Sequence, residues 1–459
     1  MKLKHSLLVA LTWCVLSCNS TRKEAYTILK GKLLNSDLSE IKLNSDDQYF
    51  DHRIQVNADG TFCDTLDLKD GRYTLFDGKN NVITYIGKGN ELSVEYDVLA
   101  LEQSLKVEGE GAKMTDYFIA KNKILQAEYA KTNEIFALDE AAFKKTIDSI
   151  RSVLTALLPE SPYIAKSFID KEKRSLKYAY LDKLNQYEQR HQYSTKNSDF
   201  KVSNTFLNPL DEMTFDRAED YQYTIDYKNL LAREIGKKAL VVRERDSLTY
   251  EESFFRVVKD ISNEQIRNMF LFDNMRYLIL TTEDLDNTYS SFKAISSDPN
   301  HLKDVTKTYD ALKSVSKGNP SPKFTKYKNH SGEATSLDDL QGSYVYIDIW
   351  ATWCAPCKAE IPFLQKIEKK FHGKNIKFVS ISVDVAKDYE TWKKMVTDMN
   401  LTGIQLFADN NFESEFIKGY AIRSIPRFIL IDPQGIIVDG NAPRPSNPKL
   451  VELFNELEI

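Results

Sequence analysis

The sequence contains few cysteines, five among 459 residues, which excludes a fold held together by several disulfide bonds. It also lacks an excess of charge of either sign, because 62 lysines and arginines stand against 67 aspartates and glutamates. The formal net charge of −5 is small for this length, so neither nucleic acid nor an anionic membrane surface is implied as a partner. The apolar run at residues 7–16 is too short for a membrane-spanning helix, which needs roughly 20 residues, so no retained transmembrane anchor is expected.

Length and composition predict an ordinary globular protein of more than one domain. Hydrophobic residues make up 42% of the chain and charged residues 28%, as in typical soluble domains. Since a domain usually takes roughly 100 to 200 residues, the chain is expected to fold as two or three domains. No repeat of fixed period is found, so a repeat array is not predicted.

The N-terminus has the pattern of a secretory signal peptide, because two lysines precede the apolar run of residues 7–16. Residues 15–18, VLSC, resemble the lipobox of bacterial lipoproteins, in which Cys18 becomes the acylated first residue. We therefore predict a signal peptide at residues 1–17 and lipidation of Cys18. The alternative is an ordinary signal peptide that leaves Cys18 as a spare thiol. No Asp follows Cys18, which by resemblance favours the outer membrane, facing the periplasm, over the inner membrane.

Residues 18–111 are predicted to form an all-β domain, a sandwich or barrel of antiparallel strands. Short β-rich runs alternate with turn residues such as Asp59-Gly60 and Asn80-Asn81. The runs are YTILKGKLL, EIKLN, FDHRIQV, TFCDTLDL, GRYTLFD, NVITYIG and ELSVEYDV. Cys63 lies in one of these runs, and we expect its side chain to be small and buried rather than a working thiol.

Residues 112–317 change to helical spacing and are predicted to form a helical spacer or scaffold. Asp139 is placed to cap one helix. The apolar face of that helix comprises Phe143, Ile147, Ile150, Leu154 and Leu157. Further helices are expected at residues 164–189, 219–240 and 264–281. Tyrosines are frequent here, and we expect them to pack laterally between helices, with a binding surface as the alternative.

Residues 318–459 are predicted to form an α/β domain with a largely parallel central sheet. Its start is marked by a turn-rich linker, KGNPSP at residues 317–322, through which a helix cannot continue. Strands are predicted in YVYIDIW, IKFVSISVD, IQLFAD, RFILID and IIVD, with helices between them. The predicted fold class is therefore multidomain: an all-β N-terminal region, an α-helical middle and an α/β C-terminal region.

The stretch WATWCAPCKAEIP, residues 350–362, carries two cysteines three residues apart. Cys354 follows an apolar strand and begins the next helix, where backbone N–H groups favour a thiolate, and Cys357 lies within bonding reach. A zinc site would need about four nitrogen or sulfur ligands, and the histidines show no ligand spacing with this pair. A structural disulfide across so short a loop would remove little chain entropy. Thiol-disulfide exchange at Cys354–Cys357 remains, with no metal and no other cofactor.

Residues 320–459 resemble the thioredoxin superfamily, and within it the membrane-tethered periplasmic thiol-disulfide oxidoreductases of the TlpA/ResA type. The matching motifs are SPKF at residues 321–324, WATWCAPC at 350–357, EIP at 360–362 and SIPRFILID at 424–432. The combination of WCxPC with a downstream Ile-Pro is far more specific than an isolated CxxC.

The resemblance implies a role for each matched residue. Cys354, expected to be exposed, attacks the substrate disulfide, and the more buried Cys357 resolves the mixed disulfide. Ile425 and Pro426 are expected to bind substrate, with a cis peptide bond before the proline that places the Ile425 backbone beside an extended substrate. Trp353 is expected to shield the disulfide and offer a flat contact surface, and Pro356 to stiffen the loop. These two residues complete the predicted substrate-binding set: Trp353, Pro356, Ile425 and Pro426.

Two carboxylates are candidates for handling protons. Asp348 lies in the strand before Cys354, at the position of the buried acid of thioredoxins, although many TlpA-type proteins carry Asn there. A carboxyl group held in an apolar strand should have a raised pKa and could accept the Cys357 proton. Glu360 occupies the position of an acidic residue in ResA-type proteins, where it is suited to tune the thiols and contact partners. The alternatives are a solvent-facing strand acid for Asp348 and a solvated helix glutamate for Glu360.

The resulting hypothesis is a lipid-anchored periplasmic oxidoreductase that reduces disulfides in envelope proteins. Reduction is favoured by Pro356 and by the absence of the histidine that oxidase and isomerase branches place between the cysteines. The resemblance implies a membrane electron donor of the DsbD or CcdA type. The β and helical regions would serve as scaffold or docking domains.

Three alternatives differ in chemistry or class. An oxidase would use the same pair of cysteines to form disulfides in its substrate, and an isomerase would use it to rearrange them. A peptide- or glycan-binding lipoprotein would use the pair as a redox latch. A peroxiredoxin would share the fold with an AhpC/TSA-type insert between Val383 and Gly419. Its peroxidatic motif would place Thr or Ser three residues before the cysteine, where this chain has Ala351.

Overall fold

The structure is a computed structural model that describes residues 26–45, 50–282 and 284–459. The predicted signal peptide and Cys18 lie outside the described residues. The chain divides into two compact units, the first ending at Lys238 and the second running from Ala239 to Ile459. The fourfold domain division drawn from the sequence stays a prediction. Among the described helices, none combines the length and the apolar composition needed to cross a membrane.

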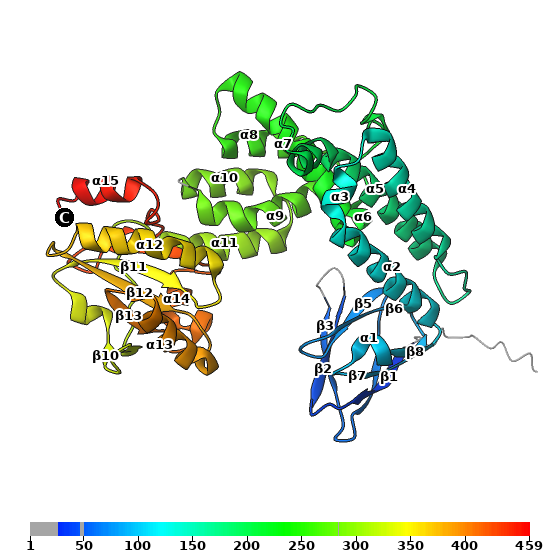
Figure 1. Cartoon of the computed structure of the whole chain (residues 1–459), viewed down its shortest axis with the longest axis horizontal. Coiled ribbons are helices and arrows are strands. Elements are labelled where there is room, and N and C mark those ends of the chain that lie inside the picture. Colours follow the sequence, from blue (N-terminus) through cyan, green and yellow to red (C-terminus); the bar gives the residue numbers. More distant parts are fainter. Residues whose placement is uncertain (1–25, 46–49, 283) are drawn as a thin grey trace, which may run out of the picture. The chain divides into compact units, whose positions relative to one another are not determined.

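The N-terminal strands form two packed sheets, as the alternating sequence pattern predicts (Figure 1). Over residues 26–45 and 50–109, each sheet has four strands. In spatial order, the first sheet contains β4 (Thr61–Leu66), β1 (Thr27–Leu34), β7 (Glu91–Asp97) and β8 (Lys106–Gly109), and the second β3 (Asp51–Gln55), β2 (Glu40–Ser45), β5 (Gly71–Phe76) and β6 (Asn81–Ile86). Buried residues of both sheets share one core, which makes the domain a sandwich. The expectation of purely antiparallel pairing is wrong, because β1 and β7 are parallel.

Cys63 is exposed, so the prediction of a buried side chain is wrong. Successive strand residues point to opposite faces, and in β4 the neighbouring Phe62 points into the shared core. Cys63 therefore points outward, opposite Lys30 in the antiparallel register with β1. Periodicity alone did not say which set of alternating residues in this run faces the core.

Beyond the sandwich, the first unit consists of helices, as the spacing of its apolar residues predicts. They are α2 (Ala112–Ala130), α3 (Thr132–Phe136), α4 (Glu140–Ala156), α5 (Lys166–Thr195), α6 (Ala218–Tyr223) and α7 (Ile225–Asp246). The predicted cap of α4 is confirmed, because the Asp139 side chain accepts a hydrogen bond from the backbone N–H of Ala142. The predicted single helix at 219–240 is wrong. Thr224 has extended dihedral angles and its hydroxyl accepts the Asp226 N–H, which ends α6 and starts α7.

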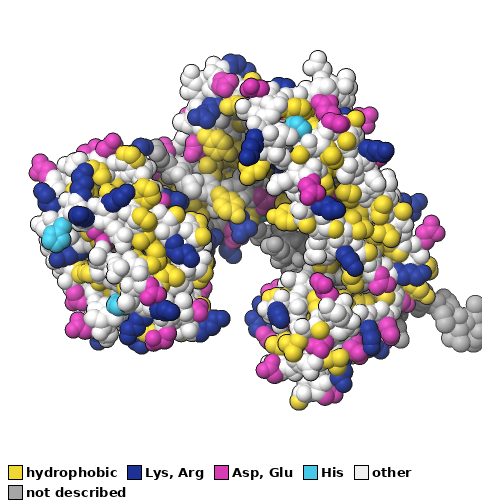
Figure 2. All heavy atoms as spheres, in the orientation of Figure 1, with side chains coloured by type: hydrophobic (Ala, Val, Ile, Leu, Met, Phe, Trp, Pro, Cys, Tyr) yellow, Lys and Arg dark blue, Asp and Glu magenta, His cyan; other side chains and the backbone are white. Residues whose placement is uncertain are grey.

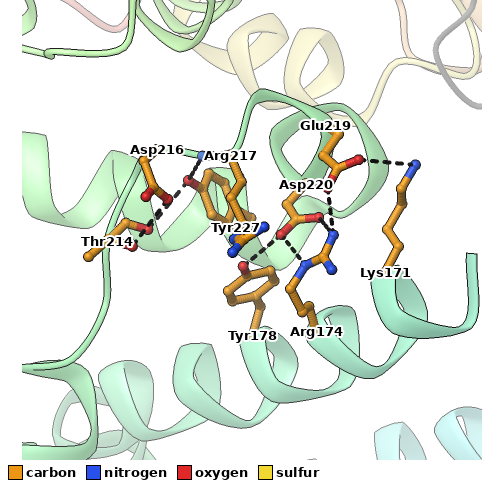
Figure 3. A network of polar contacts seen from close by, with 9 residues as sticks. All are labelled: Lys171, Arg174, Tyr178, Thr214, Asp216, Arg217, Glu219, Asp220 and Tyr227. Atoms are coloured by element: carbon orange, nitrogen blue, oxygen red, sulfur yellow. Dashed lines mark hydrogen bonds and ion pairs between the residues drawn. The ribbon is translucent and has the colours of Figure 1, made fainter. Parts of the chain in front are cut away.

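A buried ion pair holds α6 against α5 (Figure 3). The Arg174 guanidinium donates two hydrogen bonds of 2.7 Å to the two oxygens of Asp220, whose side chain is 1% exposed. The Tyr178 hydroxyl donates a third hydrogen bond of 2.8 Å to the same carboxylate. Planar, bidentate pairing of this kind offsets the cost of burying the charge. Tyr178 is itself buried, as lateral packing between helices requires.

The second unit opens with the end of α7 and a set of antiparallel helices. They are α8 (Tyr250–Lys259), α9 (Glu264–Thr281), α10 (Leu285–Ile295) and α11 (Pro299–Ser314). Side-chain caps start all four: a Thr249–Glu252 capping box, Asn263, Asp284 and Asp298. Val315, directly after α11, contributes to the core of the domain that follows, which joins this helical set to that domain.

The fully described stretch 320–459 contains a seven-stranded sheet with helices on both faces (Figure 1). Its strands, in spatial order, are β10 (Ala334–Thr335), β9 (Tyr327–Asn329), β13 (Ile404–Phe407), β12 (Ile376–Ser382), β11 (Tyr344–Trp350), β14 (Arg427–Ile431) and β15 (Ile437–Asp439). The prediction of a largely parallel sheet is wrong. In this stretch only β11–β12 and β12–β13 are parallel. The α/β alternation holds in the middle, but a tight turn after β14 makes β15 its antiparallel hairpin partner.

Two hydrophobic clusters attach the helices to this sheet. On one face, α12 (Ala355–Lys370) and α15 (Lys449–Glu456) pack against Tyr346 and Phe428. On the other, α13 (Tyr389–Asp398) and α14 (Glu415–Gly419) pack against the opposite side chains of the same strands. The strand β11 is thus buried on both faces, in line with its continuous apolar sequence. Figure 2 shows basic and acidic side chains intermixed on the visible face of the molecule.

Candidate active site

The two cysteines lie where a central strand gives way to a helix. The strand β11 ends at Trp350, a turn follows, and Cys354 caps the start of α12. The Cys354 sulfur accepts a hydrogen bond of 3.2 Å from the backbone N–H of Cys357. The two sulfurs form a disulfide bond, with a Cα–Cα distance of 5.3 Å. Because free N–H groups and the helix dipole stabilise negative charge, this position favours a thiolate on Cys354 in the reduced state.

Both cysteines are buried in this oxidised structure. Cys354 is 4% exposed and Cys357 is 3% exposed, so the expectation that Cys354 is clearly the more exposed is wrong. The reason is that Cys354 packs into the main core cluster of the domain and directs its sulfur into the helix start. The adjacent Trp353 is 60% exposed and provides an apolar surface beside the pair, and Pro356 is also exposed.

The peptide bond between Ile425 and Pro426 is cis, as the resemblance implies. The next residue, Arg427, starts β14 and pairs with Ile349 of β11. The cis proline therefore lies at the end of the sheet from which the cysteine loop leaves. Ile425 is partly buried against the core cluster that contains both cysteines. A backbone segment next to a dithiol in this way can pair with an extended peptide.

Asp348 lies within β11 and is 7% exposed. Burial in an apolar strand disfavours its charged form, and the negative charges of Glu360 and Glu368 add to the effect. Together they raise the pKa of Asp348 to about 8, although a hydrogen bond from Ser380 acts in the opposite direction. The prediction of a raised pKa is confirmed, and the alternative of a solvent-facing acid is wrong. A carboxyl group with this pKa can exchange a proton near neutral pH.

Glu360 lies one turn beyond Cys357 on α12 and is partly exposed. Its carboxylate accepts hydrogen bonds from the backbone N–H of Ser446 at 3.0 Å and from the Ser446 hydroxyl at 2.9 Å. Glu360 is thus held by a loop that approaches α12 from the C-terminal region, and it acts on Asp348 through its charge. Glu368, which sequence reasoning did not single out, lies further along α12. Burial raises its pKa too.

Sequence reasoning also missed Asp384. Its side chain is completely buried, and its carboxylate accepts hydrogen bonds from the N–H and the hydroxyl of Thr352, two residues before Cys354. A signal was present, because Asp384 directly follows the apolar strand run IKFVSISV. An acid at the end of a strand that neighbours the cysteine strand is a candidate for the same site. In the described residues, this site included, no group of three His, Cys, Asp or Glu side chains is arranged to hold a metal ion.

Comparison with known proteins places this geometry in context. Residues 317–439 match the AhpC/TSA family. The thiol-disulfide oxidoreductase ResA of Bacillus subtilis is 27% identical over 125 residues, which cover 27% of this chain and 66% of that protein. The thiol-disulfide oxidoreductase ResA of Oceanobacillus iheyensis is 30% identical over 175 residues, 37% of this chain and 80% of that protein. The chain thus spans about two thirds or more of the length of these curated relatives.

Solved structures are also similar at the sequence level. A Bacteroides vulgatus protein, described as a thiol-disulfide oxidoreductase, is 48% identical to this chain over the aligned region. The alignment covers 31% of this chain and 90% of that one, with a TM-score of 0.28.

Proposed function

This chain belongs to the thiol-disulfide oxidoreductases of the thioredoxin fold, and we propose that it reduces disulfide bonds in proteins of the bacterial cell envelope. The observation that carries the proposal is the position of Cys354. Its sulfur caps the first turn of α12 and accepts the Cys357 N–H, so a thiolate forms next to its own resolving partner.

The proposed reaction transfers two electrons in two exchange steps. The Cys354 thiolate attacks one sulfur of the substrate disulfide, which forms a mixed disulfide and releases the first substrate thiolate. The Cys357 thiolate then attacks the Cys354 sulfur, which closes the Cys354–Cys357 disulfide and releases the second substrate thiolate. The substrate is reduced to a dithiol and the protein pair is oxidised, as in this structure. A dithiol donor must then re-reduce the pair.

Asp348 is proposed to accept the Cys357 proton. A thiol must lose its proton before it can resolve the mixed disulfide, and a carboxylate with a pKa of about 8 is a base of suitable strength near neutral pH. Glu360 contributes by holding that pKa high through its charge. Trp353 and the Ile425–Pro426 segment are proposed to contact the substrate polypeptide around the attacked disulfide.

The reducing direction is supported by Pro356 between the cysteines and by the absence of a histidine there. The electron donor is proposed to be a membrane dithiol relay of the DsbD or CcdA type, and no metal or organic cofactor takes part. Re-reduction of the oxidised protein in cells should stop when that relay is deleted. Persistence of the reduced form in such cells would reject this donor.

The proposed location is the periplasm, with a lipid anchor at Cys18 after removal of residues 1–17, on the outer membrane in preference to the inner. The sequence of residues 1–18 supports it. The test is metabolic labelling with a radioactive fatty acid, followed by separation of the two membranes. Cys18→Ala should remove both the label and the membrane attachment. A labelled or membrane-bound variant would reject lipidation at this residue.

The central test is the reduction potential of the Cys354–Cys357 pair, titrated against glutathione or dithiothreitol buffers with Cys63→Ser as a control. A value near about −270 mV, that of thioredoxin, supports a reductant. A value near about −120 mV would make the protein an oxidant of the same chemistry. If neither cysteine titrates, the catalytic proposal fails.

A ligand-binding function with a redox latch is the second candidate, because the first unit contains a cavity of about 330 Å³ between the sandwich and the helices. Its lining includes Arg72, Tyr73, Lys171 and Tyr223, which combine aromatic rings with charges suited to a peptide or glycan. Loss of disulfide reduction in Cys354→Ser favours the enzyme. Binding of a peptide or glycan that survives this substitution but depends on the redox state favours the latch.

A further inference from the structure

We infer that Asp384 is a positioning residue that holds Cys354 at the start of α12 by anchoring the turn at residues 351–354. The inference rests on the proposed dithiol chemistry and adds to it a residue outside the cysteine motif. Asp384 lies two residues beyond the end of β12, the strand that pairs in parallel with the cysteine strand β11. The turn and Asp384 therefore leave the same end of the sheet.

The contacts of Asp384 are directed at one residue of that turn. One carboxylate oxygen accepts the backbone N–H of Thr352 at 2.9 Å, and the other accepts the Thr352 hydroxyl at 2.8 Å. Ser382 donates a further hydrogen bond of 2.7 Å to the first oxygen. Asp384 is 0% exposed, so these bonds form away from competing water. A two-point attachment fixes both the backbone and the side-chain rotamer of Thr352.

The two ends of the turn, Ala351 and Cys354, pack into the core cluster, and the turn has few backbone hydrogen bonds of its own. Its internal hydrogen bond is the 3.1 Å contact from the Cys354 N–H to the Ala351 carbonyl. Before the turn, the Trp350 carbonyl accepts a hydrogen bond of 2.9 Å from the Val383 N–H. This bond places the segment that carries Asp384 beside the start of the turn. The Thr352 anchor follows, and Cys354 comes two residues later. The direction in which the turn delivers Cys354 to the helix therefore depends on the carboxylate.

This geometry matters for reactivity because the helix start stabilises the Cys354 thiolate only while the sulfur faces the first N–H groups. Removal of the carboxylate would leave the Thr352 N–H buried without an acceptor, and the turn would shift to find one. The sulfur would then move from its place at the helix start. The expected consequence is a higher pKa of the Cys354 thiol and a slower attack on disulfides.

The experiment measures the rate of iodoacetamide alkylation of Cys354 against pH in the reduced full chain, with mass spectrometry of the peptide that carries it. Compared with wild type, Asp384→Ala should raise the apparent pKa of Cys354 and lower the alkylation rate at pH 7 about tenfold. Thr352→Val, which keeps the backbone contact, should give a smaller loss of rate. Thr352→Ser keeps both contacts with Asp384, so its alkylation rate should depend on pH as in the wild type. If Asp384→Ala does not fold, the two Thr352 variants still test the inference.

Ser321→Ala is the matched control, because the Ser321 hydroxyl is also buried and its hydrogen bonds are with the Pro322 carbonyl and the Tyr420 hydroxyl, outside the turn. It should lower the melting temperature without a change in the pH profile. The inference is overturned if Asp384→Ala and Thr352→Val keep the wild-type pH profile and lose only thermal stability. Failure of the wild-type pair to cycle in a glutathione buffer is a separate result, which would reject the proposed function.

Discussion

Glu360 and Ser446, which are 86 positions apart in the sequence, are joined by two hydrogen bonds of 3.0 and 2.9 Å to the Glu360 carboxylate. Both donors belong to Ser446, so the two bonds hold the Glu360 carboxylate in one position on α12. That fixed negative charge is one cause of the raised pKa of Asp348. A loop far along the chain thus influences the protonation of the acid in the cysteine strand.

Glu360→Gln should lower the pKa of Asp348 from about 8, because the substitution removes a negative charge but keeps an acceptor for Ser446. The measurement is an NMR titration of the Asp348 carboxyl carbon. Ser446→Ala is the control: it keeps the charge of Glu360 and its backbone bond, so the pKa of Asp348 should change less. An unchanged pKa in Glu360→Gln would contradict the coupling.

Asp348→Asn should make the protein more stable at pH 8 and less sensitive to pH. The pKa of Asp348 is about 8 in the folded chain and about 4 in the unfolded chain. The folded state therefore binds more protons between these values, and wild-type stability falls as the pH rises through this window. Asn carries no charge, so we expect a gain of about 1–3 kcal/mol in the free energy of unfolding at pH 8. Denaturant unfolding at pH 5 and pH 8 measures this gain. If the free energy of unfolding changes with pH by the same amount in both proteins, the burial argument is refuted.

Cys357→Ser should accumulate a mixed disulfide between Cys354 and a substrate protein, because the resolving thiol is missing. Non-reducing gel electrophoresis after expression in bacteria should show adducts that disappear on addition of dithiothreitol. Cys354→Ser should show none, since the attacking sulfur is absent. Equal amounts of adduct in the two variants would show that Cys354 is not the attacking cysteine.

Cys63 should react with a thiol reagent in the native protein, because its strand directs it to solvent. Without denaturant, the wild-type chain should bind one more equivalent of dithionitrobenzoate than Cys63→Ser. Labelling in denaturant, where every free thiol reacts, provides the reference. If the two native proteins label to the same extent, Cys63 is inaccessible and the strand orientation is wrong.

Arg174→Ala should destabilise the first unit by about 3 kcal/mol, because it leaves the buried Asp220 carboxylate without its bidentate partner. Lys171→Ala is the control. Its ion pair with Glu219 has an N–O distance of 4.0 Å and involves a half-exposed acid, so its loss should cost less than about 1 kcal/mol. Chemical denaturation measures both. Similar losses for the two variants would show that the pair in Figure 3 is not the main attachment of α6.

Features that depend on neighbouring residues in the chain could be predicted from the amino-acid sequence. The strands, the cap of α4 at Asp139 and the position of Cys354 at a helix start follow from local periodicity and capping, and the structure agrees with them. The buried environment of Asp348 also followed, because an acid within a continuous apolar run has little access to water.

Features that depend on partners distant in the sequence could be read only from the folded structure. Periodicity of two residues does not say which face of β4 is buried, so Cys63 was placed on the wrong side. Strand order and direction depend on how connections cross the sheet, which local patterns do not contain. The contact of Asp384 with Thr352 bridges 32 positions, and that of Glu360 with Ser446 bridges 86. Such pairs form only when the packed sheet brings the ends of its strands and helices together, because hydrogen bonds act over a few ångströms of space and not along the chain.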